Sequence, residues 1–291
     1  MNEMKEYTYQ WNSDWADDES KPILKITKSS LGTYNWCPKK YEYNYIQKLP
    51  QDQTEVMIKG SIIHNSREDF FKKFDVEEAK EKTPDELLMY CTTLHPIDEY
   101  HDMYEVMAAF ETQRFLESKE QDTLDTFLPV GNEVVLDAEI VVPRNVSKKY
   151  PLLRDYTVHL QGIIDRVFKE GSFYMPMELK TGGWKDSKIT DMRKEMAYYK
   201  LLYESATDEE LISKGLDPNI DFKYWAWYYP ASNHLTVEPC KKRSTTAVWD
   251  SIAKLINAYE SGLFATKFYA PTCGQYCSYF GICEGVTDNW L

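Results

Sequence analysis

The sequence predicts an α/β fold in which a mixed central β-sheet is flanked by helices. Two observations predict it, and a third predicts how the two ends of the chain meet. Apolar side chains recur at helical spacing through most of the first 120 residues. Runs rich in β-branched residues then alternate with helical patterns between residues 133 and 260. Four cysteines stand near the two ends of the chain, which indicates a site that joins the first and last helical segments.

The composition is that of a soluble globular protein. The chain has 291 residues, of which 43% are hydrophobic and 28% are charged. No apolar run reaches the roughly 20 residues that span a bilayer, so no membrane partner is expected. The first 20 residues are polar and lack the apolar core of a signal peptide, which predicts a cytoplasmic protein. In that reducing compartment clustered cysteines favour metal binding over disulfides.

The charge distribution leaves two interpretations open. The net charge of −13 argues against a passive protein that coats nucleic acid, because such proteins are usually basic. The basic residues are nevertheless clustered, so a local basic channel stands beside the alternative of ordinary solvated faces. The clustered residues are Lys39, Lys40, Lys59, Arg67, Lys72, Lys73, Lys180, Lys185, Lys188, Arg193 and Lys194.

The first 125 residues are expected to contain a polar lead-in, 1–24, and a mainly helical region, 25–125. Apolar periodicity predicts helices over 29–46, 62–74 and 84–119. The first should begin at Ser29 and Ser30, which are good N-cap residues. Breaks are expected at Pro38 and near Pro96, since proline removes a helical hydrogen bond.

The middle of the chain, 126–243, is expected to form the sheet. Alternating or β-branched runs predict strands over 133–142, 157–168, 172–180, 222–229 and 235–238. A helix over 190–203 should lie between the third and fourth of these strands. The last segment, 244–291, should start with a helix over 245–260 that stops at Gly262.

The hairpin formed by the second and third predicted strands carries the candidate chemistry. Glu178 and Lys180 are two residues apart and so share one face of a strand. A two-residue turn at Glu170–Gly171 would place Asp165 across from Pro176, diagonal to Glu178. Two carboxylates on rigid strands suit Mg²⁺ or Mn²⁺, and a neighbouring lysine can stabilise charge that develops on a phosphate. The alternative is a solvated surface strand, but the apolar neighbours favour paired or metal-bound charges.

The cysteine pattern suits a metal centre. Cys37 stands alone near the start, while Cys273, Cys277 and Cys283 follow the pattern C-x3-C-x5-C. Four thiolates can complete the ligand shell of a tetrahedral zinc ion or of an iron–sulfur cluster. The long separation between Cys37 and the other three favours the cluster, because zinc modules usually gather their ligands locally.

These motifs, in this order, resemble the RecB-like nucleases of the PD-(D/E)xK superfamily, and specifically the iron–sulfur branch that includes the CRISPR-associated exonucleases. The resemblance covers about residues 27–284. It is carried by ITKSSLGTYNWCPKKYEYNYI, KGSIIH, GIIDRV, MELKTG and PTCGQYCSYFGIC. It implies a restriction-endonuclease-like core, with a helical N-terminal region against which a C-terminal iron–sulfur segment packs.

The resemblance also implies roles for single residues. His64, Asp165 and Glu178 would bind Mg²⁺ or Mn²⁺ together with the backbone carbonyl of Leu179, and Lys180 would orient the nucleophile. Cys37, Cys273, Cys277 and Cys283 would hold a [4Fe-4S] cluster, with structural zinc as the alternative.

The chain departs from the family pattern in two places. The helix after the lysine strand usually has a glutamine four residues before a tyrosine, but this chain has Glu195 before Tyr199. Tyr199, with Glu195 and Arg193, is expected to contact DNA near the cleaved phosphate. The first two C-terminal cysteines are separated by three residues, where two are frequent in the family.

The function implied by the resemblance is a metal-dependent DNA exonuclease that hydrolyses phosphodiester bonds at single-stranded or frayed ends. One alternative is a DNA-processing subunit that acts with the partner proteins of a CRISPR-adaptation or recombination complex. Another is a non-catalytic protein that binds DNA ends. Tyr41, Tyr43 and Tyr45 could stack on unpaired bases, although tyrosines more often pack in the core.

Overall fold

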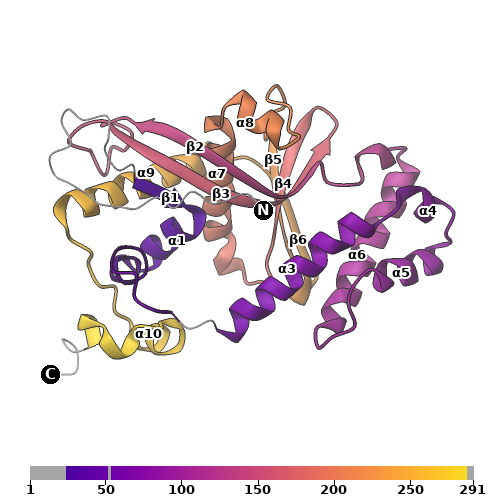
Figure 1. The fold of residues 1–291 in the computed structure, drawn as a ribbon, viewed down its shortest axis with the longest axis horizontal. Helices are drawn as coiled ribbons and strands as arrows, with labels where there is room; N and C mark the ends of the chain where they lie inside the picture. The colour runs from indigo at the N-terminus through magenta and orange to yellow at the C-terminus, as the bar shows by residue number, and fades with distance from the viewer. Residues whose placement is uncertain (1–23, 52–53, 287–291) are drawn as a thin grey trace.

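A computed structural model describes residues 24–51 and 54–286, and shows one sheet covered by helices on both faces (Figure 1). The six strands have the order β1-β3-β4-β5-β6, and β2 pairs with β3. They are β1 Leu24–Thr27, β2 Gly131–Val142, β3 Tyr156–Glu170, β4 Phe173–Leu179, β5 Tyr224–Tyr229 and β6 His234–Pro239. The predicted α/β class and the mixed sheet are confirmed. The predicted polar lead-in, 1–24, lies almost wholly outside the described residues.

Strand β1 was not predicted from the sequence, because four residues are too few to show the alternation of apolar and polar side chains that marks a strand. It pairs in parallel with the first half of β3, from Leu24 opposite Val158 to Thr27 opposite Gln161. Strand β4 pairs antiparallel with the second half of β3. The carboxyl ends of β1 and β4 therefore approach the middle of β3 from opposite directions.

The register predicted for the β3–β4 hairpin is wrong by two residues. Glu170 pairs with Phe173, so the turn consists of Gly171 and Ser172. Gly171 has a φ of +57°, and hairpin turns of this length favour glycine where φ is positive. Val167, rather than Asp165, lies opposite Pro176.

The predicted helical stretches are present, but the one predicted over 62–74 begins earlier, at Glu55, and three short helices were not predicted. The helices are α1 Lys28–Trp36, α2 Pro38–Tyr41, α3 Glu55–Lys73, α4 Val76–Lys80, α5 Pro84–Thr93, α6 His101–Glu120, α7 Ile189–Ser205, α8 Asp208–Ser213, α9 Lys242–Ser261 and α10 Ala270–Tyr276. The breaks at Pro38 and near Pro96 are confirmed, and Gly262 ends α9 with a φ of +66°. Within the described ranges, no helix is both long and apolar enough to cross a bilayer.

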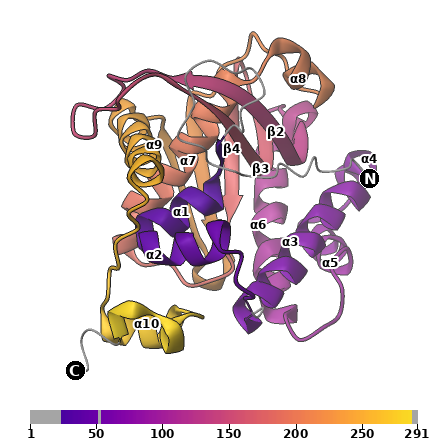
Figure 2. The ribbon, with the colours of Figure 1, turned by 60° about the vertical axis from the view of Figure 1, so that its left-hand side comes forward.

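Two apolar cores bind the helices to the sheet. On one face α1, α7 and α9 pack around residues such as Met196 and Ile252. On the other face α3, α5 and α6 pack around residues such as Phe70 and Met177 (Figures 1 and 2). Helix α7 approaches β3 closely at Gly162, where an added Cβ would lie 2.9 Å from Cδ2 of Leu202. The sheet positions the site described below, and α3 and α7 bring side chains to it.

The second core also contains buried charge. Glu111 bonds to the guanidinium of Arg67, and the Nε of Arg114 donates to Glu111 at 2.8 Å. Arg166 is buried nearby, and its Nε has no hydrogen-bond partner among the described residues. Burial and the charge of Arg67 lower the pKa of Arg166 to about 10. Two guanidinium groups thus share one fully buried carboxylate, and a third, that of Arg166, lies nearby.

His95 is buried among aromatic rings in the same core. Its ring stacks between those of Phe70 and Tyr104, with centroids 5.1 and 5.0 Å away, and its Nδ1 lies 2.8 Å from Oγ of Ser66. Burial, together with the positive charge of Arg67, lowers the pKa of His95 to about 3. The imidazole is therefore neutral in the folded protein at neutral pH.

We expect this histidine to weaken the fold in acid. Below pH about 6.5 the unfolded chain binds a proton at His95 that the folded protein does not bind until pH about 3. The free energy of unfolding should fall across this window by up to about 1.4 kcal/mol per pH unit from this group. Urea denaturation between pH 7.5 and 4.5 should show the wild type approaching the stability of His95→Gln as the pH falls. A constant difference between the two proteins would contradict the prediction.

Candidate active site

Side chains from six elements converge where β1 and β4 end. The six elements are α1, α3, α7, β2, β3 and β4. The residue that directly follows β4 also belongs to the site. The side chains are Lys28, His64, Glu133, Asp165, Glu178, Lys180, Glu195 and Tyr199. Six of these eight were predicted from the sequence; Lys28 and Glu133 were not.

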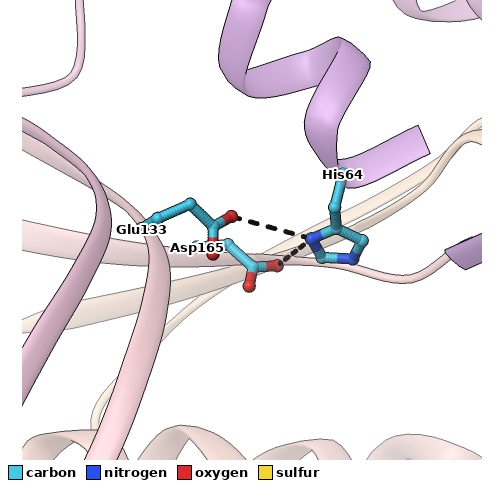
Figure 3. A group of neighbouring side chains, drawn as sticks. All are labelled: His64, Glu133 and Asp165. Atoms are coloured by element: carbon cyan, nitrogen blue, oxygen red, sulfur yellow. Dashed lines mark ion pairs between the residues drawn. The ribbon is translucent and has the colours of Figure 1, made fainter. Parts of the chain in front are cut away.

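His64, Glu133 and Asp165 form one group of potential metal ligands. One ligand atom from each lies within 4.8 Å of the others. Nδ1 of His64 is 3.8 Å from Oε1 of Glu133 and 3.7 Å from Oδ2 of Asp165 (Figure 3). Figure 3 shows the imidazole pointing from α3 toward the two carboxylates on the sheet. An imidazole with two carboxylates suits a divalent ion such as Mn²⁺ or Mg²⁺.

Glu133 joins this group through the β2–β3 register. Asn132 pairs with Arg166 and Val134 with Ile164, which sets Glu133 opposite Asp165. Oε1 of Glu133 is buried and has no hydrogen-bond partner within the described part of the chain. A buried carboxylate oxygen without a donor is costly unless a cation satisfies it, so this residue fits a bound metal.

Glu178 is held by two lysines and a tyrosine. Its Oε1 accepts from Lys28 and, at 2.8 Å, from Lys180, while its Oε2 accepts from the hydroxyl of Tyr199 at 2.9 Å. Lys180 also donates to Glu195 at 2.7 Å. The structure thus brings His64 and Asp165 together as ligand atoms and holds Glu178 beside them in a chain of alternating charges.

The pKa values of Asp165 and Glu178 are shifted in opposite directions. Burial and the neighbouring charge of Glu178 raise the pKa of Asp165 to about 6. Burial would also raise the pKa of Glu178, but the ammonium groups of Lys28 and Lys180 outweigh it and hold that pKa well below its usual range. Oδ2 of Asp165 accepts from the backbone N–H of Leu179 at 2.7 Å. Among the described residues no lysine pairs with Asp165, and a metal ion would complete this buried carboxylate.

Carboxylates of the site raise the pKa of both His64 and Tyr199. Burial alone would lower the pKa of His64, but its interactions with Glu133 and Asp165 raise it above the ordinary value. Burial and the charge of Glu178 raise the pKa of Tyr199 well above its ordinary value, so its hydroxyl remains a neutral donor. Tyr199 is fully buried and fixes Glu178 in place.

The residues expected to contact DNA already have hydrogen-bond partners within the protein. Nε and one terminal nitrogen of Arg193 each donate to Glu238 of β6 at 2.6 Å. Tyr199 is bonded to Glu178, and Glu195 to Lys180. Their contacts with DNA stay predictions.

Lys28 was missed because its position depends on β1. Thr27 caps α1 by accepting from the backbone N–H of Ser30, which places Lys28 as the first residue of the helix, directly after the strand. Its Nζ reaches Glu178, lies 3.6 Å from Oε2 of Glu195 and sits 4.9 Å from the centroid of the Tyr199 ring. Lys28 therefore supplies a second ammonium group beside that of Lys180.

The four predicted cluster cysteines line one small pocket. They are Cys37, Cys273, Cys277 and Cys283, and Trp36 and Phe280 share its wall. Lys267 donates to the carbonyl of Asn35 at 2.6 Å, and Tyr279 to that of Leu49 at 3.1 Å, which fastens the C-terminal segment to the region of α1 and α2 (Figure 2). The described sulfur atoms do not form a ligand group as close as that of His64, Glu133 and Asp165.

Comparison with known proteins identifies the family. A model of the PD-(D/E)XK nuclease superfamily matches residues 25–284. None of the curated proteins matches the chain. The crystal structure of SSO0001 is similar with a TM-score of 0.32 and 13% identity, over 79% of this chain and 97% of that chain, a likeness too weak to bear on function.

Proposed function

Because the chain belongs to the PD-(D/E)XK nuclease superfamily, whose members cleave nucleic acids with divalent metals, we propose that it is a metal-dependent DNA exonuclease. The observation that carries the proposal is the convergence of His64, Glu133 and Asp165 beside Glu178 and Lys180. Single-stranded or frayed ends are the proposed substrate, on the sequence resemblance to the RecB-like branch.

In this proposal His64, Glu133 and Asp165 would hold Mg²⁺ or Mn²⁺, and Glu178 and the backbone carbonyl of Leu179 would complete its shell. When bound, the ion would polarise a phosphoryl oxygen and make a water molecule a better nucleophile. The N–H of Leu179 keeps Asp165 oriented.

In this proposal the basic groups of the site act on the substrate, and the hydroxyl of Tyr199 holds Glu178. Burial opposes protonation of Lys180, but Glu178 and Glu195 outweigh it and raise its pKa above the ordinary value, so Lys180 carries a positive charge at neutral pH. That charge can stabilise the negative charge that develops on the phosphate. Lys28 can act in the same way, and Tyr199 keeps Glu178 in position.

We also propose that Cys37, Cys273, Cys277 and Cys283 hold a [4Fe-4S] cluster. Their common pocket supports it. The long separation along the chain between Cys37 and the other three cysteines favours the cluster over zinc, because zinc modules usually gather their ligands locally. Its role would be to fasten the C-terminal segment to α1 and α2.

Two other functions remain alternatives to an independent exonuclease. A DNA-processing subunit of a CRISPR-adaptation or recombination complex would use the same site but need partner proteins for activity. A non-catalytic DNA-end binder would have no use for a carboxylate pair with an adjacent lysine, so Asp165, Glu178 and Lys180 favour catalysis.

The test is a cleavage assay with end-labelled single-stranded DNA and Mn²⁺, on protein purified without oxygen. We expect a ladder of products from the wild type and from the control Glu209→Ala in α8, and none from Glu178→Ala or Lys180→Ala. The same sample should be brown and absorb as iron–sulfur proteins do. Cleavage that survives both substitutions would overturn the catalytic assignment, and a colourless, iron-free protein would overturn the cluster.

Replacing Glu133 should weaken metal binding. Glu133→Gln keeps the side-chain shape but removes the negative charge of an oxygen that accepts no hydrogen bond, so we expect the Kd for Mn²⁺ to rise about 10- to 100-fold. Isothermal titration calorimetry measures this directly. The control is Glu139→Gln, an exposed residue of the same strand. Equal Mn²⁺ affinity in the two variants would show that Glu133 is not a ligand.

A further inference from the structure

A pocket of about 480 Å³ lies beside the candidate active site, between α1, α7 and α9. The lining residues that matter for ligand binding are Lys28, Asn35, Trp36, Lys194, Glu195 and Ser251. Its volume is within the range of about 300–1,000 Å³ that is usual for ligand sites. Lys28 and Glu195 belong both to the pocket wall and to the charged chain around Glu178, so the pocket is continuous with the site.

Lysines from different elements gather around this pocket. Lys28 and Lys194 lie in its wall. Lys267 reaches the carbonyl of Asn35, which also lies in the wall. Burial and the charge of Lys254 lower the pKa of Lys267, and Lys194 adds to the effect, so these ammonium groups are close enough to repel one another. In a protein of net charge −13, such a local cluster suits a polyanion.

The acidic residues of the same wall are already paired. Oδ1 of Asp191 lies 3.4 Å from Nζ of Lys194, and Oε2 of Glu195 accepts from Lys180 at 2.7 Å. Their negative charges are therefore partly offset within the protein. Because Lys28 is bonded to Glu178 and Lys194 faces Asp191, an anionic ligand would compete with these carboxylates for the two ammonium groups.

Trp36 supplies an aromatic surface at the edge of the pocket. It ends α1, its side chain is 37% exposed, and it lines both this pocket and the cysteine pocket. Nζ of Lys40 lies 4.8 Å from the centroid of its ring. An exposed ring beside basic groups is the arrangement with which proteins stack unpaired bases of any sequence. Of the tyrosines that could stack on bases according to the sequence, Tyr41 and Tyr43 are buried.

We propose that this pocket binds an unpaired nucleotide of a single-stranded nucleic acid next to the reacting phosphate, with its base on Trp36 and its backbone near Lys28 and Lys194. The proposal rests on the proposed nuclease function and adds the place where the strand is held. A base inside a duplex cannot lie flat on Trp36, so the pocket would select single strands.

The test is equilibrium binding of a fluorescein-labelled oligothymidylate of about 12 nucleotides, followed by anisotropy in EDTA so that no cleavage occurs. Stacking contributes about 1–3 kcal/mol per base, so Trp36→Ala should raise the Kd about 5- to 150-fold, and Trp36→Phe should restore part of the affinity. The control is Tyr224→Ala on β5, whose side chain is 38% exposed. Thermal melting of each variant checks that it is folded.

The salt dependence tests the lysines separately. Each phosphate contact to a single strand contributes about 0.7 to the slope of log Kd against log salt concentration. Lys194→Gln should reduce that slope by about this amount, whereas the exposed Lys72→Gln in α3 should not. Binding of a blunt duplex of equal length should be the same for the wild type and Trp36→Ala.

The outcomes separate this proposal from the proposed function. If the wild type cleaves DNA but Trp36→Ala binds the oligothymidylate as tightly as Tyr224→Ala does, the pocket is not the strand site and the nuclease assignment stands. If the wild type cleaves no nucleic acid yet Trp36→Ala loses affinity, the strand site stands without catalysis. A wild type that neither binds nor cleaves overturns both.

Discussion

Asp165→Asn should reduce Mn²⁺-dependent cleavage by at least about 10³-fold. Asparagine has the same shape and can still accept the N–H of Leu179, but it no longer offers a charged oxygen to the metal. A metal ion contributes several kcal/mol to catalysis of this kind, and about 4 kcal/mol corresponds to a factor of 10³ in rate. Single-turnover cleavage of end-labelled DNA, with the variant in excess, measures the loss.

The same substitution should not damage the fold. Asp165 is buried, and burying its charge without a metal is unfavourable, as its raised pKa of about 6 shows. In EDTA, Asp165→Asn should therefore melt at the same temperature as the wild type or higher. At saturating Mn²⁺ this advantage of the variant should disappear, because the metal binds and stabilises the wild type but not the variant. A variant that melts well below the wild type in EDTA would mean that Asp165 holds the sheet together, and its inactivity would then say nothing about catalysis.

Glu111→Ala should destabilise the protein severely. Glu111 is completely buried between Arg67 and Arg114, with Arg166 close by. Removing it leaves buried guanidinium groups without a counter-charge, and breaking a buried ion pair in this way costs about 3–5 kcal/mol. Urea denaturation measures the change. The control is Glu117→Ala, an exposed residue on the same helix, which should stay close to the wild type.

A double variant identifies the cause. If uncompensated charge is responsible, Glu111→Ala combined with Arg67→Met should recover part of the lost stability, because it removes one of the unpaired cations. If the two losses simply add, the effect of Glu111→Ala comes from the cavity that it creates instead.

Most of the longer elements of the fold could be predicted from the sequence because they have a strong local signal. The alternation in β2 to β4 and the helical period of α7 and α9 are such signals, and so are the prolines that break the first and third predicted helices. Strand β1 has only four residues and no turn chemistry, so nothing local marks it. Its pairing with β3 depends on tertiary contacts alone.

The candidate site was predictable where a motif spans neighbouring residues, as with Glu178 and Lys180. Glu133 reaches it through the β2–β3 register, and a long connection between those strands leaves that register unspecified by any turn. Lys28 reaches it only because β1 joins the sheet. The hairpin register was wrong for a different reason: the positive φ of Gly171 decides which two residues form the turn.

The meeting of β1 and β4 on β3 has a consequence for synthesis of the protein. Lys28 is among the first described residues to leave the ribosome, yet β1 must wait for a partner strand more than 130 residues later in the chain, and Glu178 emerges 150 residues after Lys28. The cysteines that face Cys37 come later still. A nascent chain therefore lacks the complete candidate active site until Tyr199 has been made, so the site cannot assemble before 199 of the 291 residues have been synthesised.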